Sequence, residues 1–455
     1  MSIRSFIISK YTALGLSQRT GSLVKNVGLG FLAKGLSILI SFIQIPLILS
    51  ILDKTEYGIW ITIFSVTGWL SFFDIGMGNG FRNQLTEALA VNDTDKAKKL
   101  VSTIYISMFG IFTGIIILFI LASNYVPWVN IFNAPKQLET QLYYAVVISV
   151  SAAAINFVAA LVHIILAAKH KTGNSGMLFL VGQILTLVFI LYYKNHQTEY
   201  SFLILSTVLS VIPLIVNVAI NIYLFFSSYR SIAPSVRHYR KDYFRGLMNL
   251  GIMFFLIQIS ALIMYATDTV LINKLYGPES VTLYSIVYKY FSVITIVFTI
   301  ITAPIWTMYV DAFANKDFVW ISSNIKRLVQ FVKVSFIVLI MMNLGSSFVF
   351  HTWIDKTFNP TVSLNILVSL YMLVFIWGSI WVLPLNAAGI IKVQCIISIG
   401  QAIFNIPIIM LINIFLNNIN AVILGNIFCI IVGSGIMYIY YRRTFSNLLK
   451  SVSKV

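Results

Sequence analysis

Residues 24–50 read VKNVGLGFLAKGLSILISFIQIPLILS, an apolar stretch with a single charge in its interior, Lys34. A helix needs about 20 predominantly apolar residues to cross the hydrocarbon core of a bilayer, and this stretch is long enough. The rest of the chain has the same character, because 59% of its 455 residues are hydrophobic and only 10% are charged. Soluble domains contain about a quarter charged residues, so the composition predicts a membrane protein.

Further apolar stretches of similar length follow along the whole chain. We therefore expect an all-α polytopic membrane protein with about twelve transmembrane helices and no inserted soluble domain. The first helix is expected to be retained, because no signal-peptide cleavage pattern precedes it. The predicted helices lie near residues 24–50, 58–80, 100–123, 142–168, 176–193, 200–226, 247–273, 281–310, 328–350, 362–388, 393–416 and 419–440.

The Lys and Arg residues predict the orientation of these helices. Of the 31 in the chain, 23 fall on one side of the predicted membrane and 5 on the other, and three lie inside helices: Lys34, Lys289 and Lys333. Cytoplasmic loops are enriched in Lys and Arg, so we expect both termini in the cytoplasm. The net charge of +17 is dispersed over these loops, which argues against a nucleic-acid-binding role.

A short repeat indicates two related halves. EALAVND at 87–93 and DAFANKD at 311–317 are identical at three of seven positions and also share an acid at the first and an apolar residue at the third. The two copies lie 224 residues apart and occupy the same place in each half. Parallel repeats of this kind are found in transporters that bind their substrate between two halves. We predict an N-terminal six-helix lobe at 1–226, a basic cytoplasmic linker at 227–246, a C-terminal six-helix lobe at 247–455, and a central cavity.

Three predicted helices each carry polar residues along one face. Such a stripe can line a hydrated lumen, or its side chains can hold helices together in lipid. We favour the lumen, because a polar stripe occurs on three helices and includes a lysine on two of them. The stripes are Asn26, Lys34, Ser37, Ser41 and Gln44; Ser285, Lys289, Ser292, Thr295 and Thr299; and Gln394, Ser398, Gln401 and Asn405.

Asp74 and Asp268 are the acidic residues inside predicted helices. Charged groups are costly in a membrane and usually mark a transport path or a paired group. Judged by depth, Asp74 could pair with Lys34, and Asp268 with Lys289. Two readings stay open for each pair: an ion pair that fixes helix register, or a site where substrate or a coupling cation competes for the charge.

No metal site or catalytic site is expected. Cys395 and Cys429 have no nearby ligand-type partner, the five histidines are scattered, and the chain lacks a phosphate-binding loop of the G-x-x-x-x-G-K-S/T type.

Two motifs in the first half support a family resemblance. They are L-x-x-x-E-Y-G-I-W at 52–60 and D-x-G-x-G-N-G-x-R-N at 74–83. Together with the twelve-helix layout, they resemble bacterial polysaccharide transporters of the Wzx type, in the multidrug/oligosaccharidyl-lipid/polysaccharide exporter superfamily to which MATE transporters also belong. The motif similarity is concentrated in residues 40–100, and the second half resembles the family more loosely.

The resemblance implies a two-lobed flippase of the bacterial inner membrane. Its substrate would be an undecaprenyl-diphosphate-linked oligosaccharide, an O-antigen or capsule repeat unit, carried to the outer leaflet by alternating access. Proton or sodium coupling is suggested for the family, and other polysaccharide-assembly membrane proteins are candidate partners. No bond is made or broken, so the chain is not expected to be an enzyme.

Residues of the expected path can be named on this basis. Lys34 and Lys289 could offset the two phosphates, and Arg82 lies at the interface, where its forked donors suit a diphosphate. Arg82 could equally be one more topology-determining residue. The sugar would meet polar side chains of the stripes, in particular Ser41, Gln44, Gln401 and Asn405, and Asp74 and Asp268 are the candidates for ion coupling or ion pairing.

Two other functions compete with a flippase. A cation-coupled multidrug or organic-cation antiporter of the same superfamily should favour acidic residues in its lumen, whereas this chain has three Lys against two Asp inside its predicted helices. A polysaccharide polymerase or ligase commonly needs a large outer loop with catalytic groups. The longest predicted outer loop, 124–141, carries only Lys136 and Glu139 as charges.

Overall fold

The structure, a computed structural model, describes residues 18–70, 77–169, 171–244, 252–314 and 316–452. These residues form helices joined by short loops, and none of them lies in a β-strand. Eleven helices in the described part of the chain are long and apolar enough to span a membrane. The predicted class, an all-α polytopic membrane protein, is confirmed. The helix predicted at 58–80 includes residues 71–76, which lie outside the described residues.

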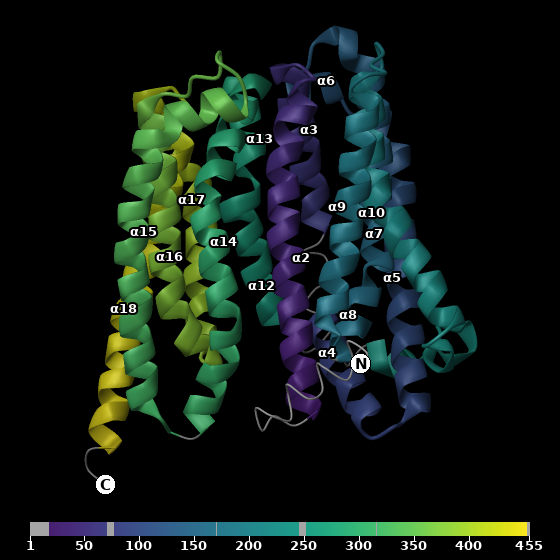
Figure 1. Ribbon diagram of the computed structural model, residues 1–455, viewed down its shortest axis with the longest axis vertical. Helices are drawn as coiled ribbons and strands as arrows, with labels where there is room; N and C mark the ends of the chain where they lie inside the picture. Colours follow the sequence, from purple (N-terminus) through teal and green to yellow (C-terminus); the bar gives the residue numbers. More distant parts are fainter. Residues whose placement is uncertain (1–17, 71–76, 170, 245–251, 315, 453–455) are drawn as a thin grey trace, which may run out of the picture. The chain divides into compact units, whose positions relative to one another are not determined.

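The chain divides into two compact units, each described here by itself. Unit 1 comprises Met1–Ile51, Asp74–Pro127 and Leu138–Gly251. In this unit α2 lies beside α9 and α7 beside α10 (Figure 1). Its helices are α2 (Gln18–Leu49), α4 (Met77–Ala90), α5 (Thr94–Ser123), α7 (Glu139–Ala159), α8 (Leu161–Ala168), α9 (Thr172–Tyr193) and α10 (Ser201–Phe226), with the short helices η3 (Arg230–Ile232) and η4 (Val236–His238).

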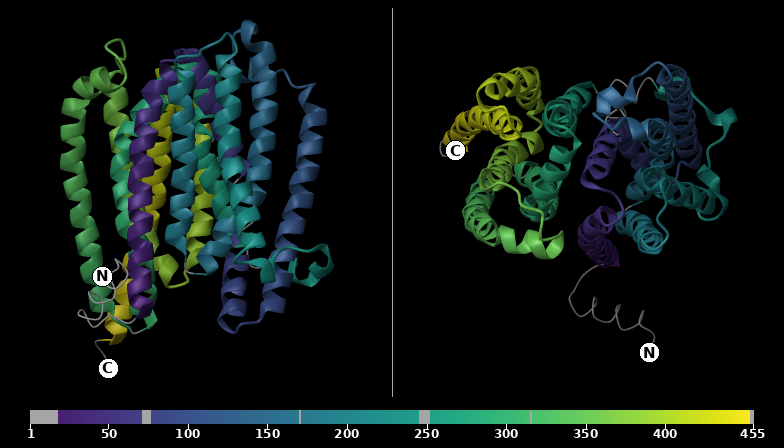
Figure 2. Two further views of the ribbon diagram at one scale, coloured as in Figure 1. Left: turned by 45° about the vertical axis from the view of Figure 1, so that its right-hand side comes forward. Right: turned by 90° about the horizontal axis from the view of Figure 1, so that it is seen from above.

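Unit 2 comprises Leu52–Phe73, Trp128–Gln137 and Ile252–Val455. Seen from above in Figure 2, its green and yellow helices lie side by side, with α16 and α17 both packed on α18. The short helix η2 (Lys136–Leu138) lies at the boundary with unit 1. The helices of unit 2 are α3 (Lys54–Trp69), α6 (Trp128–Phe132), α12 (Ile252–Ala261), the π-helical turn η5 (Leu262–Ala266), α13 (Asp268–Tyr276), α14 (Pro278–Ala314), α15 (Phe318–Trp353), α16 (Val362–Ala387), α17 (Ile391–Leu416) and α18 (Asn420–Val452).

Helix α3 packs in unit 2, although the predicted division put this segment in the first lobe. It lies against α14, where the Thr282 hydroxyl donates to the Lys54 carbonyl oxygen (2.5 Å). The contact depends on a glycine, because a Cβ atom at Gly58 would lie only 1.9 Å from the Pro278 carbonyl oxygen. The glycine of the E-Y-G-I-W motif therefore has a packing role. The division into two six-helix lobes stays a prediction.

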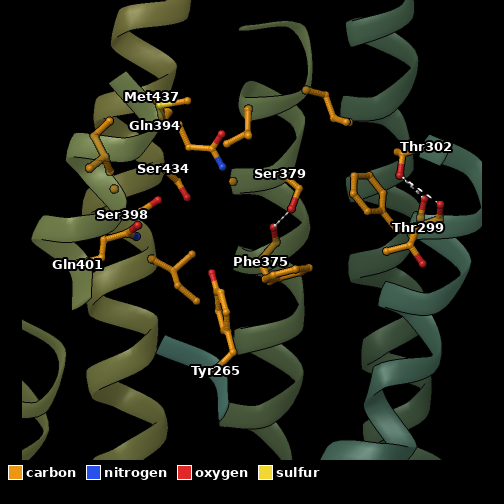
Figure 3. Close-up of a pocket in the computed structure, with 17 residues that line it drawn as sticks. Tyr265, Thr299, Thr302, Phe375, Ser379, Gln394, Ser398, Gln401, Ser434 and Met437 are labelled. Atoms are coloured by element: carbon orange, nitrogen blue, oxygen red, sulfur yellow. Dashed lines mark hydrogen bonds between the residues drawn. The ribbon is translucent and has the colours of Figure 1, made fainter. Parts of the chain in front are cut away.

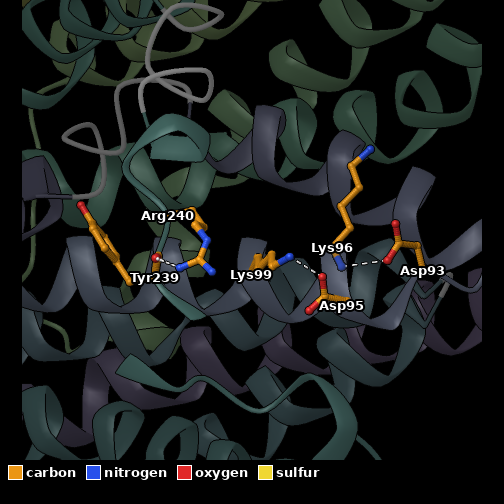
Figure 4. A network of polar contacts seen from close by, with 6 residues as sticks. All are labelled: Asp93, Asp95, Lys96, Lys99, Tyr239 and Arg240. Carbon is orange, nitrogen blue, oxygen red and sulfur yellow. Dashed lines mark hydrogen bonds and ion pairs between the residues drawn. The ribbon is translucent and has the colours of Figure 1, made fainter. Parts of the chain in front are cut away.

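The described part of the predicted linker belongs to unit 1 and packs against α5. The Ser235 backbone N–H donates to the Ser102 hydroxyl (3.0 Å), and the Arg240 backbone N–H donates to the Thr103 hydroxyl (3.0 Å). Figure 4 shows Arg240 near the start of α5, where Lys99 pairs with Asp95. Because two of its backbone donors bond to hydroxyl groups of α5, the segment is held along this helix.

The two copies of the repeat fold into the same turn. Asn92 and Lys316 both adopt a left-handed conformation (φ 58° and 57°). The aspartate that follows each of them caps the next helix: Asp93 accepts from the Lys96 N–H and Asp317 from the Trp320 N–H, both at 2.9 Å. Helices α5 and α15 therefore begin in the same way, 224 residues apart. Side-chain capping at these positions explains why aspartate stands in both copies.

Candidate functional site

A cavity of about 360 Å³ lies inside unit 2, between α14, α16, α17 and α18 (Figure 3). Tyr265 of η5 and Phe375 of α16 border it with aromatic rings. Every residue of its lining is uncharged among those that the structure describes. The polar residues of the lining, Tyr265 apart, are Thr299 and Thr302 of α14, Ser379 of α16, Gln394, Ser398 and Gln401 of α17, and Ser434 of α18.

A second cavity of about 310 Å³ adjoins the first, since both are lined by Tyr265, Thr299 and Phe375. It adds Thr295 from α14, together with two tyrosines, Tyr288 and Tyr371. Both volumes fall in the range of small-molecule pockets, about 300–1,000 Å³. The two cavities give unit 2 an internal space with aromatic walls and several hydroxyl and amide groups.

The cavities bring together two of the three predicted polar stripes. Thr295 and Thr299 come from the stripe at 281–310, and Gln394, Ser398 and Gln401 come from the stripe at 393–416. Sequence periodicity placed these residues on one face of each helix. The structure adds that the two faces meet around one internal space.

The amide of Gln401 is held in place at the cavity by a hydrogen bond to the neighbouring helix. Its Nε2 donates to the Cys429 carbonyl oxygen of α18 (2.9 Å), so the side chain is held at the wall of the cavity. A Cβ atom at Gly433 would lie 2.3 Å from this Nε2 atom. The glycine therefore makes room for the amide of Gln401.

The polar stripes did not predict that α16 and α18 also line the cavity. Each helix carries a Gly-Ser pair within an apolar stretch, 378–379 and 433–434. A Cβ atom at Gly378 would lie 2.2 Å from the Ser434 hydroxyl oxygen, so the two helices cross closely at these pairs. Small residues at membrane helix crossings are common, and these pairs were the available signal.

Asp268 lies in a buried polar cluster next to the cavities. Its side chain is 2% exposed. Asn426 Nδ2 donates to both carboxylate oxygens (2.9 and 2.8 Å), and the Tyr284 hydroxyl donates to Oδ2 (3.0 Å). Asn405, also buried, donates to Asn426 Oδ1 (2.7 Å). Asn405 therefore belongs to this cluster and does not line the cavity.

The ion pair expected between Asp268 and Lys289 does not form. Between these two described residues no salt bridge is present, and the carboxylate instead accepts hydrogen bonds from an amide and a phenol. Lys289 lies one turn beyond Ser285 on α14 and is partly exposed. Position in the chain predicts depth along the helix axis but not rotation about that axis, and rotation decides which side chain reaches the carboxylate.

The π-helical turn η5 ends two residues before Asp268. It spans Leu262–Ala266, and α13 begins at Asp268 itself. A π-helical turn shifts the phase of the helix that follows it, and such turns occur often at functional sites. Here the turn brings Tyr265 to the cavity while Asp268 faces the cluster.

The candidates in unit 1 are distributed differently. Lys34 of α2 and Arg82 of α4 have exposed side chains. Gln44 Nε2 donates to the Gln183 carbonyl oxygen of α9 (3.3 Å), and the Ser41 hydroxyl donates to the Ile38 carbonyl oxygen of its own helix (2.7 Å). The hydrogen bond from Gln44 joins α2 to α9, which is the helix-packing alternative described above for this polar stripe. Asp74 lies outside the described residues, so its pairing with Lys34 stays a prediction.

No cluster of three or more His, Cys, Asp or Glu residues suited to a metal ion occurs in the described ranges. Cys395 and Cys429 are both buried there.

Solved structures show which fold this is. A multidrug resistance MATE family transporter of the MOP superfamily, in an inward-facing conformation, superposes with a TM-score of 0.70 at 14% sequence identity, covering 93% of this chain and 96% of that chain. An outward-facing structure of such a transporter gives a TM-score of 0.62 at 13% identity, covering 94% and 96%. At this level of identity the likeness establishes the fold, which is MATE-like as predicted.

Sequence relatives and a family match complete the comparison. A Yersinia pseudotuberculosis protein named for O-antigen export is 23% identical over 375 residues, which are 78% of this chain and 81% of that protein. A Salmonella typhimurium protein named for O-antigen transport is 22% identical over 398 residues, or 83% and 86%. The family described as "Polysaccharide biosynthesis protein" matches residues 23–308. The chain therefore belongs to the polysaccharide biosynthesis protein family, as the resemblance of its motifs to polysaccharide transporters predicted.

Proposed function

We propose that this protein is a flippase for an undecaprenyl-diphosphate-linked oligosaccharide, an O-antigen or capsule repeat unit. It would move this lipid from the cytoplasmic to the outer leaflet of the bacterial inner membrane by alternating access. Family membership, two relatives named for O-antigen export or transport, and a transporter fold support the proposal. The observation that carries it is the uncharged polar cavity of unit 2.

The cavity suits a sugar better than a cation. A drug cation inside a membrane protein needs nearby negative charge or a desolvated carboxylate to offset its burial. Among the described residues, the lining here contains no carboxylate, and the buried carboxylate of Asp268 nearby already accepts hydrogen bonds from Asn426 and Tyr284. What the lining offers is hydroxyl groups, two glutamine amides and aromatic rings. Sugar hydroxyls can both donate to and accept from these groups, and Gln401 is positioned to take part.

The diphosphate requires positive charge, which each unit offers separately. Lys34 and Arg82 are exposed on unit 1, and Lys289 is partly exposed on unit 2. Arg82 would bind phosphate oxygens through its forked donors, and the lysines would act as point charges. We propose these three residues as phosphate-binding groups of the anion path. The candidates for contact with the sugar are Ser41 and Gln44 on unit 1 and Gln401 on unit 2.

Asp268 is the proposed coupling residue within unit 2. Its carboxylate is buried and held by neutral donors from Asn426 and Tyr284. A group of this kind can change its charge by taking up a proton, or can bind Na⁺ with help from nearby oxygens, and either event would alter the hydrogen bonds that join α13 to α18. This would couple an ion gradient to a rearrangement of unit 2. Asp74 is a second candidate for the same role.

The direct test uses proteoliposomes that contain the purified protein and the lipid-linked oligosaccharide. The measured quantity is the fraction of the lipid that becomes accessible on the opposite leaflet. We expect protein-dependent translocation that falls in Lys34→Ala, Arg82→Ala and Lys289→Ala. Lys136→Ala, which removes an exposed lysine outside the proposed path, is the matched control and should translocate normally.

The same preparation distinguishes the alternatives. Absence of translocation together with export of cationic dyes would replace the flippase by a cation-coupled multidrug antiporter. Normal translocation in Lys34→Ala, Arg82→Ala and Lys289→Ala would refute the proposed anion path but would still be consistent with a flippase. Coupling is tested by imposing a proton or a sodium gradient: the gradient that accelerates translocation in the wild type should have no effect in Asp268→Asn.

A further inference from the structure

A groove of about 590 Å³ on unit 1 has no role in the function proposed above. It is bordered by α5, α7 and α10 and by the segment that follows α10. These helices pack against one another, α7 on both α5 and α10 (Figure 1). The path candidates of unit 1 lie on other helices, Lys34, Ser41 and Gln44 on α2 and Arg82 on α4.

The long part of the groove is apolar and open to the membrane. Phe109 is 63% exposed, Ile222 54% and Phe226 81%, and all three lie in helices that are candidates for spanning the bilayer. Val218 and Ile155 line the same surface. Exposed apolar side chains on membrane-spanning helices suit contact with hydrocarbon chains.

The two polar side chains in the wall of the groove are satisfied by the protein. The Tyr105 hydroxyl donates to Asn221 Oδ1 (2.7 Å). Asn221 Nδ2 donates to the carbonyl oxygens of Ala159 and Asn217, both at 2.7 Å. Both N–H groups and the oxygen of the Asn221 amide are engaged in these bonds, so a molecule bound in the groove does not have to supply a hydrogen bond to it. The middle of the groove therefore suits a hydrocarbon chain.

The end of the groove is positively charged. Arg230 lines it just after α10 leaves the predicted span, which ends at Phe226. The side chain of Arg230 is exposed. The salt bridges of the described residues join Lys96 to Glu87 and Lys99 to Asp95, so none of them neutralises the Arg230 guanidinium. The following stretch, 231–246, adds Arg237, Arg240, Lys241 and Arg245 against one acid, Asp242.

We propose that this groove is a binding site for a membrane phospholipid with an anionic head group. One acyl chain lies along Phe109, Ile222 and Phe226, and the phosphate of the head group is bound by Arg230. The groove is apolar along α10 and cationic just beyond the end of this helix, at Arg230. A phospholipid has the matching arrangement, a hydrocarbon chain followed by a phosphate. Basic residues next to a membrane span attract anionic lipids, and guanidinium groups bind phosphate through paired donors.

Native mass spectrometry of the full-length protein tests the site. The protein is released from micelles doped with equal amounts of phosphatidylglycerol and phosphatidylethanolamine, and the lipids that stay bound are counted. We expect phosphatidylglycerol to be retained in preference. Arg230→Gln should reduce its retention about fivefold, to the level of phosphatidylethanolamine, because one basic residue near an anionic head group contributes about 1 kcal/mol. Val218→Trp, which fills the apolar part, should reduce the retention of both lipids.

Two matched variants serve as controls. Arg237→Gln removes an exposed arginine of the same segment that does not line the groove, and Val181→Trp enlarges an exposed valine on α9. Both should retain phosphatidylglycerol like the wild type. Monodisperse elution and an unchanged unfolding temperature establish that each variant is folded.

Three results would overturn the proposal. One is equal retention of the two phospholipids by the wild type. Another is unchanged retention in Arg230→Gln and Val218→Trp. The third is displacement of phosphatidylglycerol by an equimolar amount of undecaprenyl diphosphate with the same dependence on Arg230, which would assign the groove to the substrate.

Discussion

Substitution of Gly58 by alanine is the sharpest test of how α3 is held in unit 2. A Cβ atom at this position would lie 1.9 Å from the Pro278 carbonyl oxygen, whereas ordinary contacts begin at 3.4 Å. The helices must therefore separate locally by a distance of the order of the difference, 1.5 Å. The obstructing atom belongs to the backbone of α14, so no side-chain rotation relieves the overlap.

The expected cost follows from three contributions. Overpacking of a well-packed site typically costs about 1–3 kcal/mol. Separation of the helices would also break the hydrogen bond from the Thr282 hydroxyl to the Lys54 carbonyl oxygen, worth about 0.5–1.5 kcal/mol. Alanine is preferred over glycine inside a helix by about 1 kcal/mol. The net effect of Gly58→Ala is a loss of about 0.5–3.5 kcal/mol of unfolding free energy.

Gly68 supplies the matched control on the same helix. A Cβ atom there would meet nothing within 4 Å, so Gly68→Ala should gain up to about 1 kcal/mol from helix propensity alone. The assay is equilibrium unfolding of the purified variants in mixed micelles of a mild and a denaturing detergent. Equal stability of the two variants would show that the close contact between α3 and α14 does not contribute, and would refute the reasoning.

Two further predictions concern the cavity and the repeat. Gly433→Ala should displace the amide of Gln401, so transport should fall. Because this side chain is flexible, the unfolding free energy should stay within about 1 kcal/mol of wild type. Gly435→Ala is the control and should transport normally, because a Cβ atom there meets nothing within 4 Å. Equal loss of transport in both variants would argue against a role for the amide. Asp93→Ala and Asp317→Ala should each cost about 1 kcal/mol of unfolding free energy, because each removes a helix cap. Markedly unequal costs would contradict the equivalence of the two turns.

Much of the architecture could be read from the sequence because a bilayer imposes simple rules. Backbone polar groups must be satisfied within each span, so long apolar stretches become helices, and the class predicted from them is confirmed. The repeat at 87–93 and 311–317 was also visible, and its aspartates cap helices in both copies. Periodicity placed Thr299 and Gln401 on polar faces, which proved to line one cavity.

The tertiary structure alone decided which faces meet and which side chains pair. Depth along the chain suggested that Asp268 meets Lys289, yet the carboxylate is bound by Asn426, which is 158 residues away in sequence. Helix α3 joined unit 2 because Gly58 lets it touch Pro278. Apolar stretches specify that a helix forms and how long it is, because that depends on local sequence. Rotation and partner choice depend on the fit between helices far apart in the chain, which no single stretch contains.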